Sequence, residues 1–539
     1  WELDFATVFA RGGFDLQVGN PPWVRPRTDV DSLLSEGDPW WTLSNNSSVT
    51  TKKARMPLTL ARPEVLGTVL DGTAEVIVLS ELLSESTVYP LLSGQPDLYR
   101  AFMCQVWQHQ SARGISSLIH METHFTDTKT PGLRAVTYRH LRRHWQFINE
   151  LKLFDIQHQK IYGIHVYGPE QTPSFLHAAS LYHPETVLRS LAHDGSGEEP
   201  GFKDPHTGTW DLRPHATRIQ HVDESVLRTW QTVTESDEWN STPMVSTVNS
   251  AAIRTLETLA NQPRIASLGL HFSRGWDESI DRQKGRFIQR WGEAPWEDVI
   301  LQGSHIFVST PFYKQPNATM RNKDDWTVFD IETTTSHTIP ITIYEPAGDR
   351  DTYDRLYTHW GGSSARDHYR VAWRTQTPPT GERSLTPSII PPGSTHVDGL
   401  YSAGSPEDHC GGVLASASGA LSSLLIDFYV RSRGFSHVRT SAANSLPTVE
   451  STSPLARRVQ CRTLRLNCVT NAYADLWAEC WDESFLADAP ILERYDERPI
   501  GPAWTADTPL RRAEDRRNAQ AEIDVMVAMI LGGPIEDLC

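Results

Sequence analysis

The chain has 539 residues, of which 39% are hydrophobic and 22% charged, with 34 glycines and 35 prolines. This composition is close to that of soluble globular proteins and excludes collagen-like, coiled-coil and disordered chains, while the length allows about three to five domains. A net charge of −16 argues against non-specific nucleic-acid binding over the whole surface. The sequence shows no apolar run of membrane-spanning length and no signal peptide, and its six cysteines are too sparse for a disulfide framework, so we expect a cytoplasmic protein without membrane contact.

The chain is expected to begin with an α/β domain over residues 1–190. Residues 14–19 have the pattern of a short buried strand, which ends at once in Asn20-Pro21-Pro22-Trp23 because two prolines remove two backbone donors. Residues from 25 to about 95 are polar and irregular, with helical patches such as 75–83, and we interpret them as an insertion.

Two units of helix and strand follow the insertion, which favours an α/β fold. The apolar spacing predicts helices at 97–110 and 133–145, strands at 114–120 and 147–154, and an antiparallel pair of strands at 165–167 and 175–181 that closes the sheet.

The pattern changes beyond a turn-rich linker at residues 194–201. Residues 202–455 carry short strand-like runs broken by proline and glycine, which predicts a mixed, β-rich domain with one helix at 412–431. Residues 456–539 are expected to form a helical C-terminal module, with helices near 462–481 and 510–531.

The sharpest motif is Asn20-Pro21-Pro22-Trp23, directly after a strand. An exocyclic amino group on a base is a weak nucleophile, because its lone pair is delocalised into the ring. The side-chain oxygen of Asn20 and the carbonyl of Pro21 can accept its two hydrogens and draw the nitrogen toward sp3 character, while the prolines keep both acceptors rigid. Trp23 can stack on a base lifted out of the duplex. Taken alone, the tetrapeptide is also ordinary turn chemistry at a strand end.

The run from Phe14 to Trp23 resembles the fourth motif of gamma-class N6-adenine DNA methyltransferases, an apolar strand followed by Asn-Pro-Pro and an aromatic residue. Segments in the same order are similar to further motifs of this family, namely 97–102 to the fifth, 120–129 to the sixth, and 147–154 to a stretch typical of large fused restriction–modification (type IIG-like) and phage-defence (BREX- or DISARM-type) methylases. Residues 365–450 are similar to the target-recognition segment of those enzymes.

The resemblance implies a bacterial S-adenosylmethionine-dependent, site-specific DNA adenine-N6 methyltransferase, cytoplasmic and nucleoid-associated. Residues 1–190 would hold a partial Rossmann-like class I methyltransferase sheet, residues 202–455 would recognise the target, and residues 456–539 would form the helical module. The implied partners are double-stranded DNA and other subunits of a defence system. The catalytic residues are expected to be Asn20, Pro21, Pro22 and Trp23.

One feature departs from the family. Its members bind S-adenosylmethionine on a glycine-containing loop and an acidic residue many tens of residues before Asn-Pro-Pro, whereas nineteen residues precede Asn20 here. We therefore expect the cofactor contacts to lie mostly outside this sequence, in an N-terminal part of the same polypeptide or in a partner chain, with Asp97 and Tyr99 as contacts within it. The strand at 14–19 should then expose a hydrophobic edge.

Six residues are predicted to bind substrate: Tyr162, Arg282, Lys284, Arg286, Arg374 and Arg383. The first takes the place of a second aromatic residue that the family sets against the flipped base. The next three lie in a locally basic stretch that could face phosphate or form an ordinary solvated loop. The last two belong to the segment similar to the target-recognition region, where arginine can pair with guanine edges.

No metal site is predicted. His120 and His124 lie four residues apart and would face one way on a helix, as zinc ligands do, but their segment is predicted to be a strand end. No phosphate-binding loop of the Gly-x4-Gly-Lys type and no Gly-x-Gly-x-x-Gly fingerprint occurs, so nucleotide hydrolysis and classical dinucleotide binding have no support.

Two hypotheses follow. In the first, the chain is the C-terminal part of an adenine methyltransferase. In the second, it is a catalytically inactive, methylase-like DNA-specificity or scaffold subunit of a defence complex, a reading that the missing cofactor loop motivates.

Overall fold

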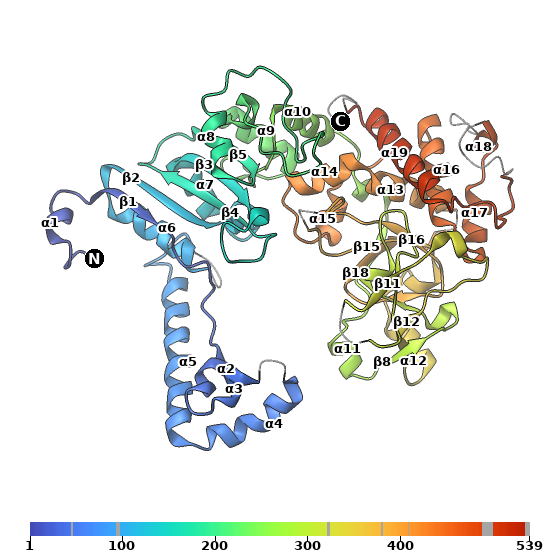
Figure 1. Ribbon diagram of the computed structural model, residues 1–539, viewed down its shortest axis with the longest axis horizontal. Coiled ribbons are helices and arrows are strands. Elements are labelled where there is room, and N and C mark those ends of the chain that lie inside the picture. The colour runs from blue at the N-terminus through green and yellow to red at the C-terminus, as the bar shows by residue number, and fades with distance from the viewer. Residues whose placement is uncertain are drawn as a thin grey trace. The chain divides into compact units, whose positions relative to one another are not determined.

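The structure is a computed structural model that describes residues 1–44, 47–92, 97–320, 324–378, 381–407, 409–487 and 500–533. The chain forms two compact units, Trp1–Asn249 and Ser250–Cys539 (Figure 1). The linker predicted at 194–201 and the residues up to 249 lie within the first unit, and the three-domain division stays a prediction. The predicted end of the insertion, near residue 95, lies outside the described residues.

The first unit is built on a six-stranded mixed sheet with the order β1-β2-β4-β3-β5-β6. β1 and β2 are parallel, as are β3 and β5, whereas β4 runs antiparallel to both of its neighbours and β6 runs antiparallel to β5. The predicted α/β fold class is confirmed. The strands are β1 (Phe14–Gly19), β2 (Gln110–Met121), β3 (Leu141–Ile148), β4 (Ile161–Tyr167), β5 (Phe175–Leu181) and β6 (Gln220–Val222).

Three local predictions about this sheet are wrong. The strand expected at 147–154 is displaced, because β3 ends at Ile148 and Asn149–Leu151 form a 3-10 turn. β4 and β5 include the expected strands at 165–167 and 175–181, but they do not pair with each other, because β3 lies between them. The helix expected at 133–145 ends at His140, and β3 begins at the next residue. Since β3 is flanked by two strands and covered on both faces, its residues 144–147 are all buried, and its sequence lacks the alternation of a half-exposed strand.

β1 is an edge strand, and among the described strands it pairs with β2 alone. Its side chains Leu16 and Val18 are 66% and 75% exposed, although both are apolar. The exposed hydrophobic edge expected of residues 14–19 is therefore confirmed. Such an edge also carries unpaired backbone donors and acceptors along its open side.

The segment that follows the Asn-Pro-Pro-Trp corner is mostly helical, so its predicted irregular structure is wrong, whereas the helical patch predicted at 75–83 lies within α5. A small apolar core around Leu34, Trp41 and Val65 holds its helices together. Figure 1 shows the longest of them, α5, running from the neighbourhood of α6 to the other three. The helices are α2 (Val30–Ser35), α3 (Trp40–Leu43), α4 (Val49–Leu60) and α5 (Pro63–Ser84).

The other helices of the first unit lie around the sheet. α6 confirms the helix predicted at 97–110, and its residues Ala101 and Cys104 pack with Leu133 of α7. These helices are α1 (Ala6–Phe9), α6 (Leu98–His109), α7 (Pro131–His140), α8 (Pro184–Ser190) and α9 (Glu224–Thr234).

The second unit is rich in short strands, as predicted for residues 202–455. β15 is central in an antiparallel four-stranded sheet with the order β16-β15-β18-β7, and the other strands form two-stranded sheets. The strands are β7 (His271–Ser273), β8 (Phe287–Gly292), β9 (Ile300–Leu301), β10 (Lys314–Pro316), β11 (Trp326–Val328), β12 (Thr342–Pro346), β13 (His359–Trp360), β14 (Ser363–Ser364), β15 (Arg370–Arg374), β16 (Ser388–Ile390), β17 (Thr395–His396) and β18 (Leu400–Gly404).

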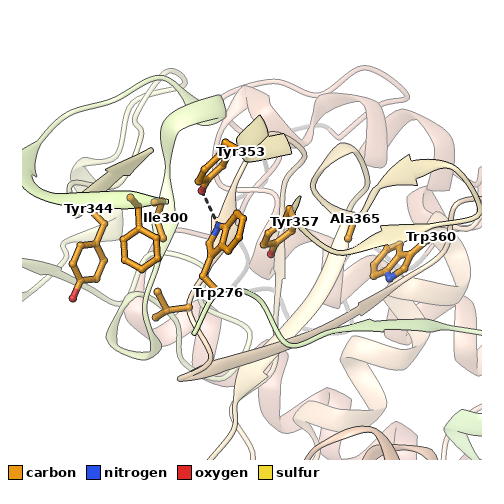
Figure 2. Close-up of a cluster of buried hydrophobic side chains, with 9 residues drawn as sticks. Trp276, Ile300, Tyr344, Tyr353, Tyr357, Trp360 and Ala365 are labelled. Atoms are coloured by element: carbon orange, nitrogen blue, oxygen red, sulfur yellow. Dashed lines mark hydrogen bonds between the residues drawn. The ribbon is translucent and has the colours of Figure 1, made fainter. Parts of the chain in front are cut away.

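An aromatic cluster forms one core of this unit (Figure 2). The indole of Trp276 packs between Tyr353 and Tyr357, and its N–H donates to the Tyr353 hydroxyl over 2.9 Å. The buried N–H of Trp276 thus finds its hydrogen-bond acceptor within the cluster. These strands, though short, therefore surround a specifically packed core.

The C-terminal part of the second unit is helical, as predicted. Helix α13 approaches α16 closely at Gly419, where an added Cβ atom would lie 2.5 Å from Val459 Cγ1. The helices of the unit are α10 (Ser250–Ala260), α11 (Ile280–Gln283), α12 (Arg350–Leu356), α13 (Gly411–Ser422), α14 (Leu424–Ser432), α15 (Thr440–Asn444), α16 (Pro454–Asn467), α17 (Ala474–Cys480), α18 (Ser484–Ala487) and α19 (Ala513–Ile530). Within the described ranges no single helix is long and apolar enough to cross a membrane. Helices α13 and α14 together reach the necessary length and apolar composition, but they are bent by 63° relative to each other.

Candidate active site

The Asn-Pro-Pro-Trp corner lies at the carboxyl end of β1. Gly19, the last residue of the strand, pairs with Leu118 of the parallel strand β2, and the two prolines then end the ladder. Pro21 is buried, whereas Asn20 is exposed and its side chain makes no hydrogen bond to another described residue. The corner therefore offers the Asn20 amide to solvent on a rigid, anchored turn.

Trp23 is fixed by contacts on three sides. Its indole N–H donates to the carbonyl of Ile119 in β2 over 3.0 Å. The ring stacks on Tyr162 at 5.6 Å between centroids with 25° between planes, and it packs against Phe154 at 5.4 Å and 56°. The indole is only half-buried, so it keeps exposed surface while its orientation is set by its neighbours.

Tyr162, predicted to touch a flipped base, lies beneath Trp23. Tyr162 is the second residue of β4 and is 3% exposed. The other face of its ring stacks on Phe147, with 5.6 Å between the ring centroids. Burial raises the pKa of its hydroxyl to about 12. In this structure its ring supports Trp23, and a base on the outer side of the indole would be separated from it by the indole.

The fifth-motif residues adjoin the corner, as the order of motifs predicts. The amide of Leu98 donates to the carbonyl of Val24 over 2.9 Å, and Arg25 lies 3.4 Å from the Asp97 carboxylate. The two predicted cofactor contacts differ in access. Asp97 is half-buried, whereas Tyr99 is fully buried and its hydroxyl bonds Thr123 Oγ1 over 2.9 Å.

The basic residues predicted to face DNA lie in the second unit and fall into two groups. Arg282 and Lys284 are exposed at the end of α11, and Arg286 is half-buried just before β8. These side chains have the access that a phosphate contact needs. Arg383 instead donates to Asp524 over 3.0 Å, and each of these two side chains is 10% exposed. That ion pair holds α19 and removes Arg383 from the surface.

Arg374 lines a cavity of about 740 Å³ in the second unit. Its guanidinium donates to the carbonyls of Gly303 and Ile306 over 2.7 and 2.9 Å, and lies 5.6 Å from the ring centre of Phe307. A guanidinium has five N–H donors, so these bonds leave donors for a ligand. Other polar side chains line the same cavity, including Gln289, Gln302, Gln376, Asp398 and Arg439.

Sequence reasoning gave no role to several residues that shape the corner. Phe154 and the Ile119 carbonyl both hold Trp23, yet they are far from it along the chain and reach it only through the pairing of β1, β2 and β4. Arg25, two residues after the motif, meets Asp97 only through the folded chain. The polar lining of the 740 Å³ cavity comes from scattered short strands and loops, which no spacing in the sequence reveals.

No protein-family model and no curated protein matches the sequence. Among solved structures, the type IIG restriction endonuclease BpuSI is 11% identical with a TM-score of 0.26, over 85% of this chain and 52% of that chain. The type IIL restriction-modification enzyme MmeI, in complex with DNA, is 9% identical with a TM-score of 0.36, over 97% and 55%. The ATP-dependent type ISP restriction-modification enzyme LlaBIII, bound to DNA, is 8% identical with a TM-score of 0.29, over 85% and 29%.

The chain thus spans about half the length of BpuSI and MmeI and less than a third of LlaBIII.

Proposed function

We propose that this chain forms the adenine-binding and DNA-recognising part of an S-adenosylmethionine-dependent, site-specific N6-adenine DNA methyltransferase. The observation that carries the proposal is the corner itself, where an exposed Asn20 amide stands three residues before a Trp23 that is held from behind. Ligands of open α/β sheets bind outside the carboxyl ends of parallel strands, which is where this corner lies. The mixed sheet, with the antiparallel β4 between β2 and β3, agrees with the α/β class that the resemblance implies.

The chemistry follows from the residue types. The Asn20 side-chain oxygen and the Pro21 carbonyl accept the two hydrogens of the adenine N6 amino group, which localises its lone pair on nitrogen. Pro22 fixes the direction of both acceptors, and Trp23 stacks on the extruded base. When bound, S-adenosylmethionine supplies an electrophilic methyl group. No base is needed before attack, because the amino proton can leave after the methyl group has been transferred.

The residues of this chain are better suited to bind the adenine base than to bind the cofactor. Tyr99 is buried with its hydroxyl engaged, and Asp97 is flanked by Arg25 and Arg100. We propose that the cofactor contacts come mainly from outside this sequence, from further residues of the same polypeptide or from a partner chain. The open side of β1, with its unpaired backbone groups, is where such residues would add a strand to the sheet, and they would also cover the exposed side chains of Leu16 and Val18.

We assign target recognition to the second unit. Its exposed Arg282 and Lys284 have the charge for backbone phosphates, and the cavity beside Arg374 offers amide and guanidinium groups of the kind that read base edges. The enzyme would belong to a restriction–modification or phage-defence system, the class that includes BpuSI and MmeI.

A direct test is the methylation state of DNA in cells that express the complete native locus in a host without adenine methyltransferases. We expect N6-methyladenine at one recurring sequence, detected by mass spectrometry of nucleosides and located by long-read sequencing. The alternative, an inactive specificity or scaffold subunit, predicts specific DNA binding by the purified complex with no methyl mark. That second pattern would contradict the proposal.

Substitutions of Trp23 test whether its ring stacks on the adenine base. Trp23→Ala should lower methyl transfer about tenfold or more, since stacking of one base on an aromatic ring is worth roughly 1–3 kcal/mol. Trp23→Phe keeps a stacking face and should keep most of the activity, although it loses the hydrogen bond to Ile119. Steady-state rates at saturating DNA measure both. Equal activity of the alanine and phenylalanine variants would argue against stacking.

A further inference from the structure

Three histidines lie side by side across three neighbouring strands of the first unit. His144 of β3 is the direct partner of His165 in β4 and of His177 in β5. Directly paired residues of adjacent strands point to the same face, so the three imidazoles form a row. All three are at most 1% exposed. The row lies on the face of β3 opposite Trp145 and Phe147, whose face packs with Trp23.

A buried carboxylate joins this row. Glu122 directly follows β2 and is 8% exposed. Its Oε1 lies 2.6 Å from His144 Nε2 and 3.7 Å from His165 Nε2. One ligand atom from each of Glu122, His144 and His165 lies within 4.8 Å of the other two. Ligands of one tetrahedral zinc ion are roughly 3–4 Å apart, because each metal–ligand bond is about 2 Å long.

A glycine makes the space for this group. Gly163 is on β4, two residues before His165, and therefore faces the same way. A Cβ atom added there would lie 2.2 Å from Glu122 Oε1 and 2.7 Å from His165 Nε2. A glycine inside a strand usually weakens it and marks a close approach of another group. Here the glycine lets a carboxylate lie directly over the strand, against an imidazole.

The group is incompletely satisfied without a cation. His144 Nε2–H donates to Glu122, but His165 Nε2 has no hydrogen-bond partner although the residue is fully buried. The neighbouring His120, equally buried, is satisfied by the Tyr167 hydroxyl at 2.9 Å. A buried polar atom without a partner is costly, and it calls for a specific explanation.

We propose that Glu122, His144 and His165 bind a divalent transition-metal ion, zinc by preference. Two imidazole nitrogens and one carboxylate oxygen are ligands that zinc favours, and a water molecule would complete four-coordination. The ion would replace the proton now shared by His144 and Glu122, which leaves to solvent on binding. It would tie the end of β2 to β3 and β4, directly behind the sheet face that carries Trp23, and so stabilise the support of the corner.

The surroundings of the three ligands suit this role. Metal-bound histidines and carboxylates are usually oriented by a second hydrogen bond. Glu122 Oε2 accepts from Gln146 Nε2 over 2.8 Å, and His144 Nδ1 lies 2.7 Å from His177 Nδ1. His120 and His124, considered from the sequence, are not in the ligand group: the first bonds Tyr167 and the second faces the Tyr99 hydroxyl at 3.3 Å.

The test is zinc binding by the purified protein after dialysis against a chelator. Wild-type protein should bind one Zn²⁺ per chain in isothermal titration calorimetry and unfold at a higher temperature with Zn²⁺ than without it. His165→Gln keeps a polar side chain but removes a ligand, and it should abolish this binding. Gln146→Leu should weaken binding about 10–100-fold. His120→Gln is the matched control, equally buried and stacked 3.8 Å from His165, and it should bind like wild type.

Two results would overturn the proposal: no stoichiometric binding by wild type, or equal binding by His165→Gln and His120→Gln. If His165→Gln does not fold, the absorption spectrum of cobalt-substituted wild type decides. Tetrahedral ligation by nitrogen and oxygen gives visible bands much stronger than those of aqueous Co²⁺ and no near-ultraviolet thiolate band, whereas a thiolate charge-transfer band would place the ion at cysteine instead, and the weak bands of aqueous Co²⁺ would mean no site. These outcomes do not depend on methyl transfer, so the metal site and the proposed function can fail separately.

Discussion

Asn20→Ala should reduce methyl transfer about 10²–10³-fold, the cost typical of removing one preorganised group that stabilises a transition state. The alanine removes the acceptor that localises the lone pair of the adenine amino group. Because Asn20 is exposed and its side chain bonds no other described residue, the change should leave folding and thermal stability intact. Incorporation of labelled methyl groups into DNA by the complete enzyme measures the effect.

Two further variants sharpen this experiment. Asn20→Asp keeps a side-chain oxygen in place and should retain more activity than the alanine variant. Asn261→Ala is the matched control, because that amide is also exposed, just past the end of α10, and among the described residues it bonds the Glu257 carbonyl of that helix. Wild-type rates in Asn20→Ala would remove this residue from the mechanism and leave the corner a structural turn.

Arg383→Ala should destabilise the second unit rather than weaken DNA binding selectively. The arginine donates to Asp524 over 3.0 Å, and Asp524 also accepts from the Leu424 amide over 2.8 Å, at the start of α14. Burial raises the pKa of Asp524, while the charge of Arg383 opposes that rise. Breaking a buried ion pair by removing one partner costs about 3–5 kcal/mol. Calorimetry should show the thermal transition lowered by roughly ten degrees.

Arg282→Ala provides the comparison for that variant. Arg282 is exposed, so its removal should leave the thermal transition in place and reduce DNA affinity and the salt dependence of binding. The double variant Arg383→Ala with Asp524→Ala should recover part of the lost stability, since no buried charge is left unpaired. An unchanged transition in Arg383→Ala, together with weaker DNA binding, would restore the prediction that this arginine contacts the target.

Much of the fold is local enough to be predicted from the sequence. The strand at Phe14–Gly19 and the helix at Leu98–His109 have clear periodicity and clear ends, and both were predicted within a residue or two. The boundary at His140 was missed because β3 is buried on both faces and continues the apolar spacing of α7. The separation of β4 from β5 was missed because strand order depends on long-range pairing, which no local pattern encodes.

In the candidate site, too, the local motif could be predicted from the sequence, whereas the contacts set by long-range packing could not. The residues of the corner could be predicted because their chemistry lies in four consecutive positions. Tyr162 and Arg383 were predicted to touch substrate by their place in the chain, but neighbouring elements bury both, the first under Trp23 and the second against α19. The group of Glu122, His144 and His165 could not be predicted, since only the pairing of β3 with β4 and the end of β2 bring it together.

The helical segment between the corner and α6 departs from the sheet of the first unit and returns to it at one point. Val24 and Leu98 are joined by a backbone hydrogen bond of 2.9 Å, and Arg25 meets Asp97 beside it. A chain excursion with its two ends clamped together can be shortened, lengthened or exchanged without shifting the register of the strands that carry it. A change in the length or sequence of helices α2 to α4 should therefore leave the position of Asn20 at the end of β1 unchanged.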